Sequence, residues 1–203
     1  MADIKNDRRQ EILQAARNEF IKEGISGART QAIADHIGVT KAMIHYYFKT
    51  KENLFKEVFR QASKSFIDGL LDPLEREGPL FKKIEAFIDQ LINRLENNPE
   101  LAGFITNELR RHNEITAPIF RDACNIETTV FARQLEEAAS DYEIAPVTPD
   151  QVIINIFSLC AFPYVGRGLL KGLLKKQNSQ QYQSLLNERR EMVKDTVINW
   201  LAG

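Results

Sequence analysis

The sequence predicts an all-α protein, in which a small N-terminal unit of three helices precedes a larger helical region, with about nine helices in total. Apolar residues recur at intervals of three and four along nearly every segment, which is the period of a helix. Glycine and proline separate these segments where helices would end or begin. Hydrophobic residues make up 43% of the chain and charged residues 27%, which is typical of a folded globular protein.

Four helices are expected in the first third of the chain. The first opens near Asp7 and buries a stripe that includes Ile12 and Phe20, and the fourth is a long amphipathic helix that bridges to the rest of the chain. The predicted N-caps of the second, third and fourth helices are Thr30, Thr40 and Thr50, and the predicted stops of the first, second and fourth are Gly24, Gly38 and Pro73.

Five further helices are expected near residues 80–97, 99–112, 117–140, 149–174 and 179–201. Prolines that stand where a helix would start are Pro79, Pro99, Pro118 and Pro149. Pro163 is an exception, because inside a helix it removes one hydrogen bond and crowds the carbonyl four residues earlier. A kink is therefore expected near Leu159 to Pro163.

Charge is distributed unevenly along the chain. Residues 1–51 hold nine Lys and Arg against six Asp and Glu, whereas the rest holds 18 against 22. A basic first segment on an acidic remainder favours a polyanion as the partner of the first segment alone.

The second and third helices have the residues that a helix-turn-helix requires. Ala34 is small where two backbones would approach, Gly38 tolerates a positive φ in the turn, and Ile44 is an apolar anchor on the next helix. In such a unit the second helix enters the DNA major groove. The outward face of that helix here is aromatic and basic, so the pattern predicts DNA binding.

Residues 8–55 resemble the N-terminal domain of the TetR family of bacterial transcriptional regulators. The segment "ARTQAIADHIGVTKAMIHYYFKTKENLF" carries the resemblance through its capping threonines, isoleucine-alanine pair, glycine-valine turn and aromatic cluster. The resemblance implies a DNA-binding domain over residues 1–50, a bridging helix from residue 51, and a helical effector-binding and dimerisation domain over residues 51–203.

The third helix is expected to contact bases through Lys41, Ala42 and His45. Lys41 can reach guanine acceptors, and Ala42 is small enough to touch a thymine methyl. His45 departs from the tyrosine that is more usual in the family, so its preferred base stays open. Phosphate contacts are expected from Thr30, Thr40, Tyr46, Tyr47 and Lys51, with the alternative that a tyrosine packs on the first helix.

A homodimer is expected, because two half-sites about 34 Å apart combine the modest affinities of two modules on a palindromic operator. The last two predicted helices have broad apolar faces, in agreement with the four-helix interface that the resemblance implies. The expected interface residues are Val152, Ile156, Leu159, Leu185, Met192, Val193, Thr196 and Trp200. The alternative is that these faces complete the core of a single chain.

The middle helices are expected to surround an unknown small-molecule effector. Phe104, Glu108 and Arg111 share one helix face, with His112 beside them. The other candidate pocket residues are Phe120, Cys124, Phe131, Cys160 and Tyr164. Phenylalanines at this spacing also suit a plain core, and Glu108 with Arg111 also suits a solvated ion pair. An effector that binds one arrangement of the two DNA-binding units more tightly would release the protein from DNA. A repressor is the expected form, because a bound dimer blocks a promoter without a polymerase contact, and activation stays open as the alternative.

Other classes of function find less support in the sequence. The histidines are scattered, and no helical HExxH, nucleophile elbow or phosphate loop appears, so no enzyme, cofactor or metal site is expected. Two alternatives stay open: a metal- or thiol-responsive DNA-binding sensor that uses Cys124, Cys160 and His112, and a helical interaction module without DNA binding.

Two features bear on localisation. The N-terminus lacks the apolar segment of a signal peptide, so a cytoplasmic protein is expected. The longest uncharged apolar run, Val152 to Val165, is shorter than the roughly 20 residues of a membrane span, and no membrane partner is expected.

Overall fold

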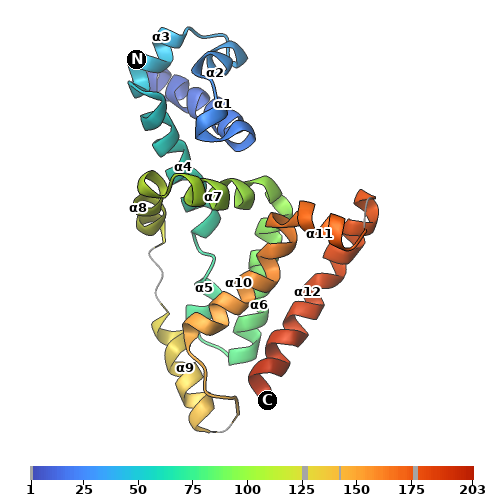
Figure 1. Cartoon of the computed structure of the whole chain (residues 1–203). Coiled ribbons are helices and arrows are strands. Elements are labelled where there is room, and N and C mark those ends of the chain that lie inside the picture. The colour runs from blue at the N-terminus through green and yellow to red at the C-terminus, as the bar shows by residue number, and fades with distance from the viewer. Residues whose placement is uncertain (1, 125–127, 142, 176–177) are drawn as a thin grey trace. The chain divides into compact units, whose positions relative to one another are not determined.

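The computed structural model describes residues 2–124, 128–141, 143–175 and 178–203, and these residues form helices and no strand (Figure 1). The helices are α1 (Ala2–Gly27), α2 (Thr30–His36), α3 (Lys41–Phe48), α4 (Lys51–Ile67), α5 (Asp72–Glu75), α6 (Leu80–Asn97), α7 (Pro99–Arg111), α8 (Asn113–Ala123), α9 (Thr129–Ser140), α10 (Pro149–Val165), α11 (Arg167–Leu173) and α12 (Ser179–Ala202). The predicted all-α class is confirmed. The described residues hold twelve helices because three of the predicted segments are broken.

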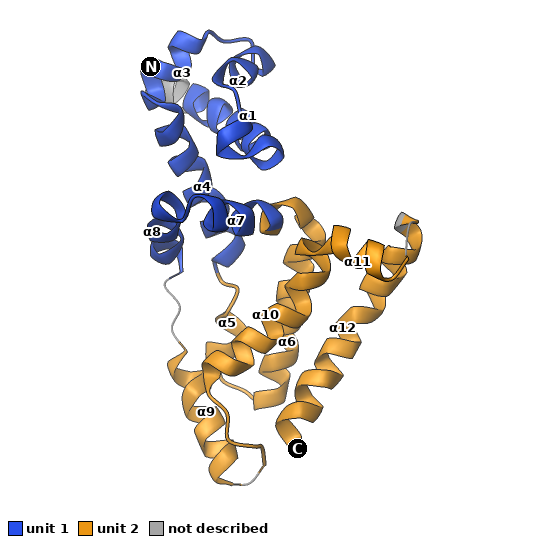
Figure 2. Cartoon of the chain, viewed as in Figure 1, with its two compact units in different colours: residues 1–68, 103–125 blue, residues 69–102, 126–203 orange. Residues whose placement is uncertain are grey.

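Contacts divide the chain into two compact units (Figure 2). Unit 1 comprises residues 1–68 and 103–125, and unit 2 comprises residues 69–102 and 126–203. Unit 1 therefore joins the first four helices to most of α7 and to α8. The predicted functional division at residue 50 stays a prediction.

Unit 1 is built on an apolar core between α1, α2, α3 and α4. Ile12 and Phe20 of α1 are fully buried, as is Phe55 of α4. The rings of Phe20 and Phe55 meet edge to face with their centroids 5.3 Å apart, a favoured aromatic geometry. The inner faces of α2 and α3 pack on this core, and their outer faces stay exposed.

Two of the predicted helix boundaries in unit 1 need adjustment. Helix α1 begins at Ala2, earlier than the Asp7 expected, and Gly24 (φ 65°, ψ 175°) breaks it without ending it. Helix α4 ends at Ile67 and not at Pro73, because Gly69 adopts φ 66° and the short α5 follows. Pro73 lies at the start of α5, where its missing N–H costs least.

The single helix predicted over residues 117–140 is wrong, since α8 ends at Ala123 and α9 starts at Thr129. Pro118 lies inside α8 and not at a helix start. The start of α9 is fixed by a carboxylate from another helix, because Glu75 of α5 accepts hydrogen bonds from the N–H groups of Val130 (3.1 Å) and Phe131 (3.2 Å).

Helix α10 continues through Pro163 to Val165, and the chain bends by 78° at Gly166, three residues beyond the predicted kink. Proline lacks the N–H that would bond the Leu159 carbonyl. The Arg189 guanidinium replaces it, donating to that carbonyl from Nε (3.3 Å) and Nη2 (3.2 Å). At Gly166 a Cβ would lie 3.0 Å from the Phe162 carbonyl oxygen, so a larger residue would strain the bend.

Unit 2 packs α10 and α12 against α6 through buried aliphatic residues. Arg190 of α12 connects the same helices, since it donates to Asp89 (3.0 Å), Asn93 (2.8 Å) and Glu96 (3.0 Å) of α6. In the described part of the chain no single helix is long and apolar enough to cross a membrane, and only the bent pair α10 and α11 passes that test together, by length and composition.

Candidate nucleic-acid interface

The turn between α2 and α3 has the geometry that the sequence predicts. Ala34 is fully buried where the helices approach, and Ile44 is buried beneath α3. Gly38 adopts φ 65°, and its neighbour Val39 donates its N–H to the Ala34 carbonyl at 3.0 Å. This bond gives the Ala34 carbonyl, near the end of α2, a hydrogen-bond donor, as in other helix C-caps that use a left-handed residue. A helix-turn-helix results.

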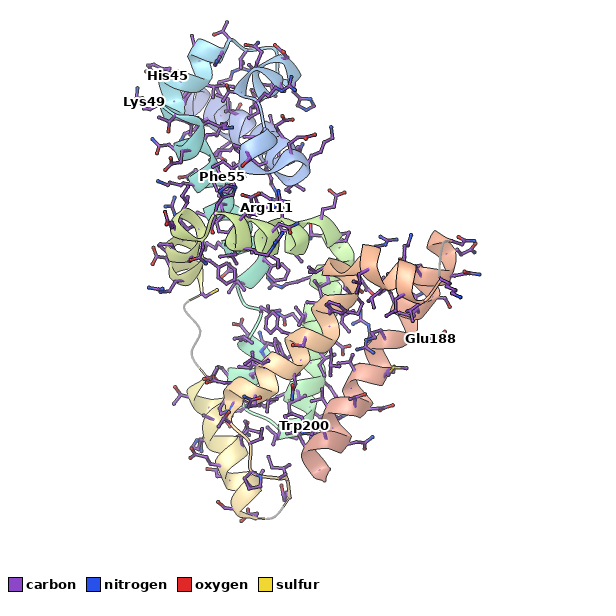
Figure 3. The ribbon with its side chains drawn as sticks, in the orientation of Figure 1. His45, Lys49, Phe55, Arg111, Glu188 and Trp200 are labelled. Carbon is purple, nitrogen blue, oxygen red and sulfur yellow. The ribbon has the colours of Figure 1, made fainter. Side chains whose placement is uncertain are left out.

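Helix α3 is two turns long and is capped as predicted. The Thr40 side chain accepts the N–H of Met43 at 3.3 Å, which satisfies one of the free donors at the helix start. Ile44 and Phe48 point into the unit, one turn apart, whereas Lys41, Ala42 and His45 are exposed. The three predicted base-contacting residues therefore share the free side of α3, and Figure 3 places His45 and Lys49 on this helix and just after it.

A shallow depression of about 230 Å³ brings several predicted DNA contacts together. Its lining includes the predicted base residues Lys41 and His45 and the predicted phosphate residues Thr30 and Lys51. Residues from the start of α2, from α3 and from the start of α4 thus meet on one surface. The same surface includes Lys49, which the sequence reasoning did not select.

Lys49 is the residue that the sequence reasoning missed. It follows the last residue of α3 in a left-handed conformation (φ 66°), and its Nζ donates to the Tyr46 carbonyl at 3.1 Å. The same ammonium lies 5.6 Å from the centre of the Tyr46 ring, within cation–π range. The signal was a lysine directly after an aromatic helix and before the next cap.

The two tyrosines stay on the surface side of α3. Tyr46 is 56% exposed, and Tyr47 is half-buried. Their rings meet edge to face at 5.3 Å, and Tyr47 also lies 6.4 Å from the Phe48 ring. Tyr47 is thus held in place by the edge of the core while Tyr46 projects outward.

Thr30 does not cap α2, in contrast to the prediction. Arg29 occupies the N-cap position, and no side chain caps this helix. Instead the N–H of Arg29 donates to the Glu19 carboxylate at 3.1 Å. Thr30 is the first residue of α2, where its hydroxyl lines the depression. Lys51 is tied to the same segment, because its Nζ donates to the Ala28 carbonyl at 3.1 Å.

The residues expected to line an effector pocket fall in both units. In unit 1, Phe104 and Glu108 are buried, His112, Phe120 and Cys124 are half-buried, and Arg111 is exposed. Phe104 packs on the core rings of Phe55 (6.2 Å) and Phe59 (5.9 Å). In unit 2, Phe131 and Cys160 are fully buried and Tyr164 is half-buried.

Burial controls the acidity of two of these groups. It raises the pKa of the Cys160 thiol to about 12, so that this thiol is protonated at neutral pH. Burial, with the nearby Glu96 carboxylate as the second cause, also raises the pKa of Tyr164 to about 12. Within the described residues no three His, Cys, Asp or Glu side chains cluster as a metal site would require.

The predicted dimer residues divide into two sets. Val152, Ile156 and Val193 are buried within the single chain, whereas Leu159 and Leu185 are half-buried and Met192, Thr196 and Trp200 are exposed. An apolar groove of about 680 Å³ lies between α10, α11 and α12. Its lining includes Leu159, Phe162, Leu170, Leu174, Leu185 and Met192.

Helix α11 extends this apolar surface. Its cations turn inward, with Arg167 Cζ 5.4 Å and Lys171 Nζ 5.9 Å from the centre of the Tyr182 ring. Its leucines turn outward, so that Leu169 is 65% and Leu173 72% exposed. We call the groove together with these two leucines the α10–α12 surface.

The fold of residues 12–58 and the exposed face of α3 are those of a helix-turn-helix domain of the DNA-binding class. The family described as "Bacterial regulatory proteins, tetR family" matches residues 12–58. This match covers an N-terminal segment of the chain and supports membership of the tetR family.

Similar proteins extend the likeness beyond the matched segment. The nucleoid occlusion factor SlmA of Marinomonas sp. (strain MWYL1) is 29% identical over 108 residues, which span 52% of this chain and 54%, about half, of that protein. The probable HTH-type transcriptional regulator YttP of Bacillus subtilis (strain 168) is 22% identical, over 88% of this chain and 87% of that one. The putative transcriptional regulator SCO4942 of Streptomyces coelicolor shares the fold, with a TM-score of 0.67, 22% identity, and 95% and 97% of the two chains covered.

Proposed function

We propose that this protein is a homodimeric repressor that binds a palindromic operator in double-stranded DNA and is released by a small-molecule effector. The observation that carries the proposal is the face of α3, where Lys41, Ala42 and His45 are exposed on a scaffold that buries Ile44 and Phe48. A helix of this kind fits the major groove.

The roles of the individual side chains follow from their chemistry. Lys41 donates to guanine acceptors, Ala42 allows close approach or contacts a thymine methyl, and His45 donates to or accepts from a base edge. Phosphates are contacted by the Tyr46 hydroxyl and, as an addition to the predicted set, by Lys49. The further phosphate contacts are Thr30, Thr40, Tyr47 and Lys51.

Dimerisation is proposed to use the α10–α12 surface. An apolar surface that includes two leucines more than half exposed is unusual for a chain that stays monomeric. The groove is also lined by Glu188 and Arg189 of α12, so the surface carries both charge signs. A surface that contacts its own copy across a two-fold axis needs such self-complementarity.

Repression and release are proposed on the division into a DNA-binding domain (residues 1–50) and an effector domain (residues 51–203). A bound dimer blocks a promoter without a polymerase contact. An effector that binds another arrangement of the two DNA-binding domains more tightly than the DNA-bound arrangement lowers operator affinity. The size of this effect is set by the difference between the effector's affinities for the two arrangements. The candidate pocket residues named above are the proposed place to look for the effector, and the cytoplasm is the proposed location.

The metal- or thiol-responsive alternative is not favoured. Burial raises the pKa of Cys124 as well as that of Cys160, which keeps both thiols protonated and poorly reactive. The half-buried Cys124 belongs to unit 1 and the buried Cys160 to unit 2.

Selection of bound duplexes from a random pool tests the proposal. We expect a palindrome with half-sites about one helical turn apart, because two α3 helices read successive major grooves. Affinity for the selected duplex should fall steeply with salt, since phosphate contacts release counterions. Failure to enrich any sequence, with affinity that does not change with salt, would support a helical interaction module instead.

A further inference from the structure

Glu108 of α7 has a feature that folding alone does not explain. Its side chain is buried, with 4% of the residue exposed, and its Oε2 has no hydrogen-bond partner. The Nε2 atom of His112 lies 3.9 Å from this oxygen, which is beyond hydrogen-bond length. A buried and incompletely paired carboxylate lowers the stability of a fold, so such a group points to a function.

The carboxylate of Glu108 contacts the backbone of α1 where that helix is broken at Gly24. The N–H of Ile25, which follows the break at Gly24, donates to this carboxylate. Because Oε2 is unpartnered, the accepting atom is Oε1. A Cβ at position 24 would lie only 2.7 Å from the same Oε1. Gly24 is therefore required both by its positive φ and by the space that Glu108 occupies.

The last turn of α1 connects this contact to the DNA-reading helices. The N–H of Ala28 donates to the Gly24 carbonyl at 3.1 Å, which closes the turn. The carbonyl of Ala28 accepts from Lys51 at 3.1 Å, and the next N–H, that of Arg29, donates to Glu19 at 3.1 Å. Helix α2 begins one residue later. One turn of backbone thus separates the contact of Glu108 from the start of α2.

We propose that Glu108 is a proton-linked positioning residue for DNA binding. Its ionised carboxylate holds the Ile25 N–H and keeps the turn between α1 and α2 in the arrangement that presents α3, and protonation loosens this hold. The proposal rests on the proposed DNA-binding function and assigns to it a residue of α7 that lies outside the DNA-contacting face.

The surroundings of Glu108 fix the sign of the pH dependence. Burial raises the pKa of Glu108, opposed first by the nearby His112, then by the Ile25 hydrogen bond and by Arg111. From α1, Ser26 contributes its hydroxyl, which lies 3.2 Å from His112 Nε2. From α8, Thr116 donates to the carbonyl of His112 at 2.9 Å. Loss of the Ile25 bond raises the pKa further, so operator affinity falls as the pH falls through this pKa.

Fold stability responds in the opposite direction. A carboxyl whose folded pKa lies above its unfolded value binds protons preferentially in the folded state, so the free energy of unfolding rises as the pH falls toward that pKa. A residue that only stabilised the fold would move stability and DNA affinity together. For Glu108 we expect DNA affinity to fall while the free energy of unfolding rises as the pH is lowered.

The test compares the full-length wild type with Glu108→Gln on the duplex selected from the random pool. At about pH 8 we expect the variant to bind about three- to tenfold more weakly, and this difference should shrink as the pH is lowered through the pKa of Glu108. Its thermal unfolding midpoint at about pH 8 should equal or exceed that of the wild type. The matched control Glu114→Gln removes an exposed carboxylate from α8 and should change neither quantity.

His112→Asn provides an independent measurement that does not depend on the folding of the first variant. Loss of His112, whose proximity lowers the pKa of Glu108, should shift the midpoint of the pH profile of DNA binding to higher pH. The proposal is overturned if the Gln variant binds as the wild type does at every pH, if it loses affinity and stability in parallel, or if the Asn variant leaves the midpoint unchanged. A wild type that binds no duplex at all would instead refute the proposed function.

Discussion

Two surfaces of this chain are not covered by the unit to which each belongs: the exposed face of α3 in unit 1 and the α10–α12 surface in unit 2. They differ in chemistry. On α3 the exposed groups include Lys41, His45 and Tyr46, and capping threonines flank the helix. On the α10–α12 surface they are leucine, phenylalanine and methionine, and the nearby cations of α11 turn inward over Tyr182.

The difference indicates the kind of partner that each surface suits. Cations and hydroxyls on a helix that projects from a small core suit phosphates and base edges, which are polar and stay hydrated. Apolar groups around a groove suit another protein surface, from which water is excluded. The predictions below test this contrast, from the largest expected effect to the smallest.

Met192→Glu should have the largest effect. Met192 is 52% exposed beside the groove, so the substitution leaves the single chain folded but places an unpaired charge in the proposed interface. We expect the dimer dissociation constant to rise by about 100-fold or more, measured by sedimentation, and operator affinity to fall with it. Asn187→Glu is the matched control, since Asn187 is exposed about 140° around the same helix. A Met192→Glu protein that stays dimeric would exclude this surface as the interface.

Lys41→Ala should come second and should affect sequence preference. Loss of a base contact costs about 1–3 kcal/mol at the matching position of the operator, so selected and scrambled duplexes should become harder to distinguish. Binding to both duplexes is measured at one salt concentration. Lys64→Ala removes the same charge from an exposed position on α4 and should preserve the preference. Equal effects of the two substitutions would mean that Lys41 does not read bases.

Lys49→Ala should have a smaller effect that is uniform over sequences. A lost phosphate contact lowers the affinity for every duplex and reduces the slope of log affinity against log salt by about 1. Lys51→Ala should do the same and should also lower the unfolding midpoint, because Lys51 bonds the Ala28 carbonyl. Titrations at several salt concentrations, together with thermal unfolding, separate the two lysines. An unchanged salt slope in both variants would remove them from the interface.

Thr40→Ala should have the smallest effect, on stability. Loss of the cap on Met43 should cost about 1 kcal/mol of unfolding free energy, measured by denaturant titration. Thr30→Ala is the comparison, because Thr30 caps nothing and should cost less. Equal costs would show that the two threonines have the same structural role.

Much of unit 1 could be predicted from the sequence because its signals are local. The helix-turn-helix depends on residues a few positions apart, and Ala34, Gly38 and Ile44 lie where the spacing places them. The absence of a cap at Thr30 could not be predicted from spacing alone. There a distant carboxylate, that of Glu19, satisfies the backbone N–H that begins the helix.

The tertiary structure decided the features that depend on residues far apart in the chain. Arg189 supplies the Leu159 carbonyl with a replacement for the bond that Pro163 removes, and the 78° bend lies at Gly166. Glu75 sets the start of α9, and Glu108 occupies the break in α1.

By itself the sequence determined the helical class, the helix-turn-helix and the polarity of each surface, because these follow from local periodicity and capping. Only the folded chain decided where helices break and which carboxylates are buried. The physical reason is that a backbone group left without a partner by its own segment bonds to whatever side chain packing brings beside it.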